Sequence, residues 1–467
     1  MRMEMRLENQ SPTDCIIDYA LGLEYYHLPQ ETINFLKIHV LDTLGAIVAG
    51  SKADVSARLL QLLIEWGGNP EGTILVYNKK VPLINAAWIN STMARGYDFE
   101  SIMPKGATHA PASIIPAALA FSEYSKHKKG KPINGEDFLT SIALGLDLNF
   151  RLRVAGGSAT AMGGGWLAET FAPIAIAALG GKLLGFNRDK IRNAMGIAYN
   201  QCFGNYGAVV GEGGSYLAQV SQGLGTKAGV LSVLLADRGF TASKEDIIEG
   251  KWGLYNMYGN GEYDPSLLLD RLGKDYDHLI PIVKRYPGCG GLQNAVATAL
   301  EIVSEGIRPE EISKVRIKVS ELNYYQLVHG RGKPSFPSEI LWNERFAVAI
   351  AFAKKRFSLY EINENVLKDQ QVIRLFEKIE VTPDESLKGE ELEMEVVTMN
   401  GKVCRKEKKT LPPMTDLEVV QKFKSCLKFS LPSIPEERID EIISVLDNLN
   451  KIEDMSEIFK LFRGEEL

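Results

Sequence analysis

Apolar residues recur three or four positions apart along much of the first half of the chain, as they do on one face of an α-helix. The stretch ETINFLKIHVLDTLGAIVAGS carries such a stripe and ends at Gly50. The stretch NGEDFLTSIALGLDLNFRLRVAGG begins at Asn134, a residue type that caps helix N-termini, and its pattern stops at Gly156. Further helices are expected at about residues 113–126, 168–185, 188–203 and 216–238. The first half therefore predicts a packed bundle of helices.

The pattern changes from about residue 265 onwards. In ISKVRIKVSEL, Val315, Ile317 and Val319 alternate with polar residues, which predicts a half-buried strand. ELEMEVVTMNGKVCRKEKKTL indicates two strands joined at Asn400-Gly401, a dipeptide that tolerates the positive φ angles of a type I′ hairpin turn. Helical patterns return in SEILWNERFAVAIAFAKKR and after about residue 415.

These patterns predict a mainly α protein built from two parts. We expect an all-helical domain over residues 1–265, a smaller α+β domain over residues 266–410, and a helical tail over residues 411–467 that could pack back onto the first domain. A chain of 467 residues is long enough for two or three such units with ample core.

Composition places the chain among ordinary globular proteins. Hydrophobic residues make up 45% and charged residues 24%, and the formal net charge is -6. Basic residues are scattered, so no nucleic acid partner is expected. The N-terminal stretch MRMEMRLENQSPTDC is charged throughout, and no run approaches the roughly 18 apolar residues of a membrane helix. We therefore expect a cytoplasmic protein that does not span a membrane.

The five cysteines are far apart and follow no metal-ligand spacing; they are Cys15, Cys202, Cys289, Cys404 and Cys426. A disulfide framework, a zinc site and an iron–sulfur site are all disfavoured by this distribution. We expect chemistry without a metal or cofactor.

Three loops are unusually rich in glycine: GGSATAMGGGW, GNYGAVVGEGGSY and YPGCGGLQ. Glycine lets the backbone approach a ligand closely. None of the loops matches a nucleotide-binding motif. They indicate either tight turns between helices or the wall of a small-molecule pocket.

The sharpest group of candidate catalytic residues is Asp98, Glu100 and His109, in GYDFESIMPKGATHAP. A histidine can take or return a proton near neutral pH, and a nearby carboxylate can fix its tautomer or raise its basicity. The alternative is a histidine that caps the following helix beside surface acids.

Three cations are candidates for holding an anionic substrate. Lys284 and Arg285 precede a glycine-rich loop at the expected domain boundary, where pockets tend to form, although such cations are also common on solvated surfaces. Arg151 lies in a mostly apolar helix, and a buried guanidinium needs an anionic partner.

Several stretches of the chain, in order and at similar spacing, resemble the MmgE/PrpD family. They are VLDTLGAIVAGS, AAWINSTMARGYDFES, HAPASIIPAALAFSE, GGKLLGFN, GTKAGVLSVLLADRGFT and VKRYPGCGG. The family includes 2-methylcitrate dehydratase, cis-aconitate decarboxylase and iminodisuccinate epimerase. The resemblance implies a helical domain made from the N-terminal part and the C-terminal tail, an inserted α+β lid, and a homodimer.

The resemblance also implies roles for individual residues. Asp98, His109 and Lys284 match family positions that surround a small di- or tricarboxylic acid. The shared step there is removal or delivery of a proton at a carbon next to a carboxylate. His109 would be the base or acid, and Lys284 and Arg151 would hold the anion.

The chain departs from the family pattern at several of these positions. Trp166 or Leu167 stands where family members commonly carry a second histidine. Ala218, which precedes Gln219, replaces a lysine. Glu100 replaces an aspartate, and Ile102 replaces a threonine. These changes imply a more apolar pocket and a substrate with fewer carboxylates, or a step that needs one base.

The sequence therefore favours a lyase, with a dehydratase first and an epimerase or decarboxylase as alternatives; a non-catalytic carboxylate-binding protein is a further alternative. The candidate catalytic residues are His109, Asp98 and Lys284, and the candidate substrate-binding residues are Arg151, Glu100, Arg285, Trp166 and Gln219. Tyr324, Tyr325 and His329 lie in a stretch that could enter the cleft from the lid.

Overall fold

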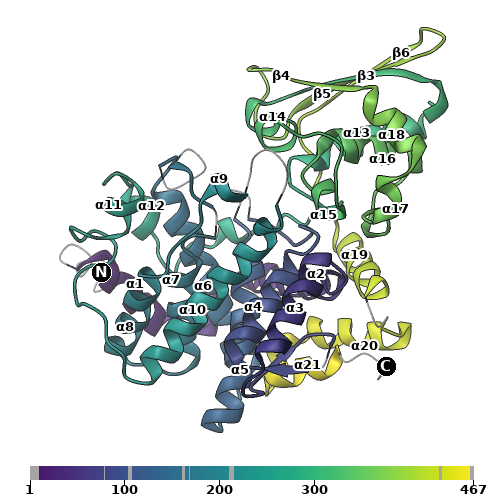
Figure 1. The fold of residues 1–467 in the computed structure, drawn as a ribbon. Coiled ribbons are helices and arrows are strands. Elements are labelled where there is room, and N and C mark those ends of the chain that lie inside the picture. The colour runs from purple at the N-terminus through teal and green to yellow at the C-terminus, as the bar shows by residue number, and fades with distance from the viewer. Residues whose placement is uncertain are drawn as a thin grey trace.

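The computed structural model describes residues 10–77, 79–103, 108–159, 164–167, 169–209, 215–430 and 434–462. The expected glycine-rich loops at 156–166 and 204–216 lie partly outside these residues. The chain folds mainly into helices, as the sequence predicted, and it also contains a small mixed sheet (Figure 1).

The N-terminal part is a body of helices. Its elements are α1 (Pro12–Gly22), α2 (Gln30–Gly50), α3 (Asp54–Trp66), α4 (Leu83–Ala94), α5 (Pro111–Lys129), α6 (Gly135–Ala155), α7 (Ala172–Leu183), α8 (Arg188–Tyr199), α9 (Tyr206–Val209), α10 (Leu217–Asp237), α11 (Leu254–Tyr258) and α12 (Pro265–Leu269). A short antiparallel pair, β1 (Gly72–Ile74) and β2 (Lys79–Val81), lies beside α4. The helices expected over most of this half are confirmed.

Local chemistry explains where these helices begin and how closely they pack. The Asn134 side chain accepts a hydrogen bond from the Asp137 backbone N–H at 2.8 Å, which confirms it as the N-cap of α6. At Gly50 the end of α2 touches α4 so closely that a Cβ atom would lie 1.8 Å from the Met93 carbonyl oxygen. Glycine is therefore required at this helix contact.

The second part combines helices with a four-stranded sheet. Its elements are α13 (Leu292–Ser304), β3 (Ile312–Val319), α14 (Glu321–Leu327), α15 (Pro337–Ile340), α16 (Glu344–Lys354), α17 (Glu364–Leu367), α18 (Gln370–Glu377), β4 (Ile379–Pro383), β5 (Leu392–Thr398) and β6 (Val403–Lys408). The strand order is β4-β3-β5-β6, with β3 parallel to β4 and the other pairs antiparallel. Val315, Ile317 and Val319 are buried, so the expected alternation in this strand is confirmed.

The hairpin between β5 and β6 forms where the sequence placed it, but its turn type differs from the expectation. Gly401 has a φ of 82°, whereas Asn400 does not have the positive φ that a type I′ turn requires. The backbone pairs Thr398 with Lys402 and leaves three residues in the loop. A three-residue loop needs a positive φ only at its last position, and glycine supplies it there.

The chain then returns to the helical body through α19 (Asp416–Phe429), α20 (Glu436–Asp447) and α21 (Ile458–Leu461), coloured yellow in Figure 1. Helix α19 packs on α2, and a buried ion pair of 2.7 Å joins Lys422 to Asp42. In the described part of the chain, α2 alone has the length and apolar character of a membrane span, and 78% of that stretch is buried inside the fold. Such burial is typical of a core helix.

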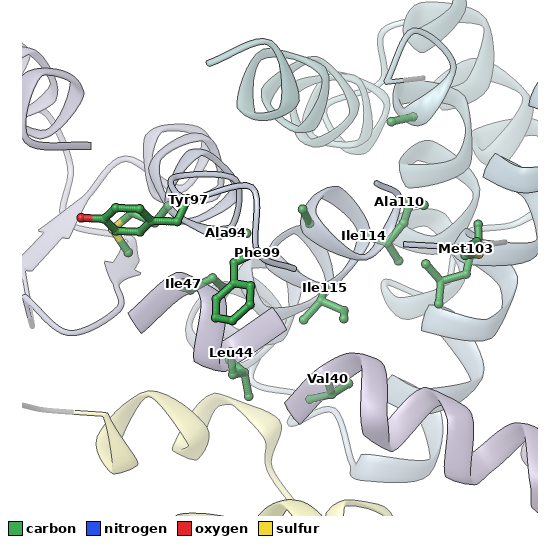
Figure 2. Close-up of a cluster of buried hydrophobic side chains, with 14 of the residues drawn as sticks. Val40, Leu44, Ile47, Ala94, Tyr97, Phe99, Met103, Ala110, Ile114 and Ile115 are labelled. Carbon is green, nitrogen blue, oxygen red and sulfur yellow. The ribbon is translucent and has the colours of Figure 1, made fainter. Parts of the chain in front are cut away.

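Apolar side chains of α2, α4 and α5 meet beneath the segment that carries the acidic residues. Figure 2 shows Tyr97 and Phe99 among this cluster, together with Leu44 and Ile115. Tyr97 and Phe99 alternate in sequence with Asp98 and Glu100. The core therefore anchors the segment through its aromatic residues.

Candidate active site

A cavity of about 250 Å³ lies where the helical body meets the α+β part. Its polar wall residues include Arg95, His109, Arg153, Glu169, Tyr206, Asn323, Gln326 and Glu390. Its apolar wall residues include Ile102, Trp166, Leu167, Val209, Ala218, Leu322 and Trp342. A largely apolar cavity with a few convergent charged groups is typical of a small-molecule site.

His109 is the histidine of this wall, two residues before α5 begins. Its Nδ1 lies 2.5 Å from Oε1 of Glu100, and 15% of its side chain is exposed. Burial alone would raise the pKa of the Glu100 carboxyl, but Arg95, Lys284 and His109 together hold it well below its ordinary value. Nδ1 also lies 2.8 Å from the Arg95 guanidinium, but the contact with Glu100 is shorter, and an ionised carboxylate only accepts hydrogen bonds, so we assign the proton to Nδ1. Nε2 then has the lone pair of a base.

Two buried cations bind the acidic segment. Arg95, at the end of α4, donates to Asp98 and lies 2.7 Å from Oε1 of Glu100. The Lys284 ammonium group donates to the Asp98 carboxylate at 2.5 Å and to its backbone carbonyl at 2.7 Å. Burial would raise the pKa of Asp98, but Arg95 and Lys284 outweigh it and lower that pKa. The two cations and two carboxylates form a buried cluster whose charges balance.

The backbone at this cluster is strained and is supported from behind. Asp98 has a φ of 48°, a conformation that a residue other than glycine keeps only where its surroundings impose it. Lys422 donates to the Phe99 carbonyl at 2.6 Å, and His39 lies 2.9 Å from the Ser101 hydroxyl. Helices α19 and α2 thus fix the position of the acidic segment.

Asp98, Glu100 and His109 each offer a ligand atom, and these atoms lie within 4.8 Å of one another, a spacing that a metal ion could bridge. Arg95 and Lys284 already bind the same carboxylates. A divalent cation would therefore meet two fixed positive charges, and the residues present fit an ion-pair cluster better than a metal site.

A second arginine on the cavity wall was not expected from the sequence. Arg153 lies near the end of α6 and is 5% exposed. Burial lowers the pKa of its guanidinium to about 10, and the nearby Glu169 opposes this shift. Arg95 was also missed, although its place three residues before Asp98 in the sequence was a usable signal for an ion pair.

The structure places two of the expected cations away from the cavity. Arg151 donates to the Asp147 carboxylate at 2.5 Å and to backbone carbonyls near α12, so its anionic partner belongs to the protein itself. Arg285 pairs with Glu418 at 2.6 Å near the surface. Neither lies among the described residues that form the cavity wall. Lys284 is likewise not among the described residues that line the cavity, and it contacts the acidic segment through its hydrogen bonds to Asp98.

Four apolar residues at positions that depart from the family pattern line the cavity. Trp166, Leu167 and Ala218 all line the cavity, and Ile102 lines it beside them. Gln219 does not line it; both side-chain amide atoms are buried and have no hydrogen-bond partner among the described residues.

The α+β part contributes side chains from α14, but not the ones that the sequence suggested. Leu322, Asn323 and Gln326 line the cavity. Tyr325 instead stacks on His329, with their ring centroids 5.7 Å apart. The Gln326 amide donates to the Tyr206 hydroxyl at 2.8 Å, which joins the α+β part to the helical body across the cavity.

Sequence comparisons match both halves of the chain to one family. The MmgE/PrpD N-terminal domain matches residues 14–266, and the MmgE/PrpD C-terminal domain matches residues 286–448. A cis-aconitate decarboxylase of Aspergillus terreus is 25% identical over 311 residues, which are 65% of this chain and 62% of the fungal protein. The match therefore spans less than two thirds of that relative.

Mammalian relatives align over nearly their full length at lower identity. The cis-aconitate decarboxylase of Homo sapiens is 21% identical over 97% of this chain and 95% of its own length, and that of Mus musculus is also 21% identical. Together with the two domain matches, these relatives identify the chain as a member of the MmgE/PrpD family.

Proposed function

We propose that this protein is a lyase that acts on a small carboxylic acid, with proton transfer at a carbon next to a carboxylate. The observation that carries the proposal is the geometry of His109, whose Nδ1 is held by Glu100 while the ring lines a cavity that also contains Arg95 and Arg153. Membership of a family with lyase relatives supports the same class of reaction.

In the proposed reaction, Nε2 of His109 takes the proton from the carbon beside the substrate carboxylate. The electron pair of the broken C–H bond moves toward that carboxylate, where Arg95 and Arg153 offset the growing negative charge. A carbon acid of this kind is weak, so the fixed position of the base and the cations supplies much of the rate.

We favour dehydration as the second half of the reaction. The pair of electrons then expels a hydroxyl group from the neighbouring carbon, and that group leaves as water after it accepts a proton. Glu390 lines the cavity from the α+β part, and burial raises the pKa of its carboxyl despite the nearby Lys284. A protonated Glu390, or His109 returning the proton that it took, would supply this acid.

A decarboxylase is the second candidate because the curated relatives bear that name. Decarboxylation breaks a C–C bond, releases CO₂ and needs a proton delivered to carbon, which protonated His109 could provide. An epimerase would return the proton to the opposite face of the same carbon. The homodimer, the α+β lid domain of residues 266–410 and the cytoplasmic location remain predictions.

Proton NMR in heavy water tests these reactions without choosing among them beforehand. The protein would be incubated with malate, citrate, methylcitrate, aconitate and aspartate, and deuterium uptake and new signals followed. We expect one acid to react with the wild type and with His329→Asn, an exposed histidine outside the cavity wall, but not with His109→Asn. Binding of an acid without any exchange or product would instead indicate a carboxylate-binding protein.

A further inference from the structure

A buried glutamine lies directly behind His109. Gln222, on α10, is fully buried, and its side-chain amide nitrogen donates to the His109 backbone carbonyl at 3.1 Å. The same nitrogen donates to the hydroxyl of Ser113, in the first turn of α5. His109 and Ser113 lie 113 and 109 positions before Gln222 in the sequence. A distant helix therefore holds the stretch of backbone from which the His109 ring extends.

The partners of the Gln222 amide fix its orientation. A backbone carbonyl only accepts hydrogen bonds, so the amide atom that faces the His109 carbonyl must be the nitrogen. The Ser113 hydroxyl, which accepts from the same nitrogen, donates in return to the Gln222 backbone carbonyl at 3.5 Å. Gln222 and Ser113 therefore hold each other, and the serine keeps the amide pointed at His109.

Stability alone does not explain a glutamine at this position. Its amide oxygen is buried and has no hydrogen-bond partner among the described residues, and an unpaired buried acceptor is costly. The His109 carbonyl already accepts from the Ala112 backbone N–H at 3.0 Å, so it does not need the Gln222 amide. A methionine of similar length would avoid the cost of the unpaired oxygen. The contact with His109 is therefore the feature that glutamine adds.

α10 itself packs tightly on α4, the helix whose C-cap is Arg95. One residue after Gln222, a Cβ atom added to Gly223 would lie 2.4 Å from the Thr92 hydroxyl oxygen, so a side chain has no room at this contact. Close packing of this kind leaves the two helices little freedom to move against each other. Gln222 thus ties His109 to the same rigid pair of helices that positions Arg95.

We propose that Gln222 is the positioning residue of His109: it fixes the backbone of the base, while Glu100 fixes Nδ1 of its ring at 2.5 Å. Two points of attachment set the direction in which Nε2 meets the substrate carbon. This inference rests on the proposed function and adds to it a residue that does not line the cavity. A displacement of about 1 Å at a reacting group can cost roughly 100-fold in rate, so loss of this contact should act on the chemical step and not on binding.

Gln222→Met removes both donor contacts and keeps the length of the side chain. With the acid that reacts in heavy water, we expect kcat for deuterium uptake to fall about 10- to 100-fold while KM changes less than about twofold. In protein with isotope-labelled histidine, the ring C–H resonances of His109, assigned by their absence in His109→Asn, should shift because the ring moves against Glu100. A purely structural role would lower the melting temperature but would leave these resonances and kcat of the folded protein unchanged.

Gln201→Met is the matched control. The Gln201 amide also donates to a serine hydroxyl and to a backbone carbonyl, those of Ser232 at 2.8 Å and Ile197 at 3.2 Å, and Gln201 does not line the cavity. This variant should keep kcat, KM and the His109 resonances of the wild type. Ser113→Ala guards against misfolding of Gln222→Met. It leaves Gln222 in place but removes the hydroxyl that orients its amide, and kcat should fall severalfold.

The possible failures are distinguishable. If an acid reacts with the wild type, but Ser113→Ala and a folded Gln222→Met keep its kcat and the His109 resonances, the positioning role is refuted and the proposed lyase stands. An equal loss of kcat in Gln201→Met would also refute the positioning role. If no acid reacts with the wild type, the proposed lyase fails. A shift of the His109 resonances in Gln222→Met or Ser113→Ala, but not in Gln201→Met, then still decides whether Gln222 positions the ring.

Discussion

Glu344 is a buried carboxylic acid that makes the stability of the α+β part depend on pH. It is the first residue of α16, its side chain is fully buried, and neither oxygen has a hydrogen-bond partner among the described residues. Burial raises the pKa of its carboxyl from 4.5 to about 8. The ionised form is therefore disfavoured in the folded protein relative to the unfolded chain.

The direction and size of the effect follow from the two pKa values. Below pH 4.5 the carboxyl is protonated in both states, so it makes no difference to stability. Between pH 4.5 and about 8 the unfolded chain releases the proton and the folded protein keeps it, so stability falls as pH rises. At about 1.4 kcal/mol per pH unit, the full cost approaches about 5 kcal/mol above pH 8. This is a large share of the stability of a typical protein.

The substitution Glu344→Gln removes the charge and keeps the shape. We expect the variant to have a higher free energy of unfolding than the wild type. This difference should be about 3 kcal/mol larger at pH 8.5 than at pH 5.5. Urea unfolding at the two pH values, followed by tryptophan fluorescence, measures this difference. Glu361→Gln is the control, because Glu361 is also buried but is paired with Arg356 and Ser358, and its loss should destabilise the fold at both pH values. If the free energies of unfolding of Glu344→Gln and the wild type differ by the same amount at both pH values, the reasoning is refuted.

Three further substitutions test the site and its support. Glu100→Gln removes the carboxylate that holds Nδ1 of His109, and we expect the reaction rate to fall at least about tenfold, measured as deuterium uptake, with the fold retained by circular dichroism. Lys422→Met leaves Asp42 as an unpaired buried acid and should lower the free energy of unfolding by about 3–5 kcal/mol at high pH. Because burial raises the pKa of Asp42, this loss of stability should become smaller as the pH falls and the carboxyl takes up a proton. Gly50→Ala forces a methyl group against the Met93 carbonyl and should cost about 3 kcal/mol in thermal or urea unfolding, whereas Gly22→Ala, with no atom within 4 Å of the added carbon, should cost far less.

Local sequence was enough to predict those features that depend on neighbouring residues. The period of the apolar residues located the main helices and the strand at 312–319, and Asn134 marked the start of α6. The group of Asp98, Glu100 and His109 also emerged from the sequence, because these residues share one short segment, although distant residues such as Lys284 hold that segment in place.

The same reasoning was less successful where the choice depended on which face of an element meets the cavity. Arg151 and Arg153 are two positions apart on α6, and two steps of about 100° turn their side chains to nearly opposite faces of the helix. One pairs with Asp147 and the other lines the cavity. Both faces of α6 are buried, so the sequence offered no hydrophobic pattern to tell them apart.

Local periodicity and motifs in a fixed order were sufficient to place the helical and strand segments, to recognise the family and to select His109 as the catalytic candidate. Three other features became visible only in the folded chain: Lys284 meets Asp98 across 186 positions, Arg285 pairs with Glu418, and Leu167, Val209 and Ala218 line one cavity. These contacts arise from the packing of distant segments. Their energies depend on burial and charge in three dimensions, which the order of residues along the chain does not specify.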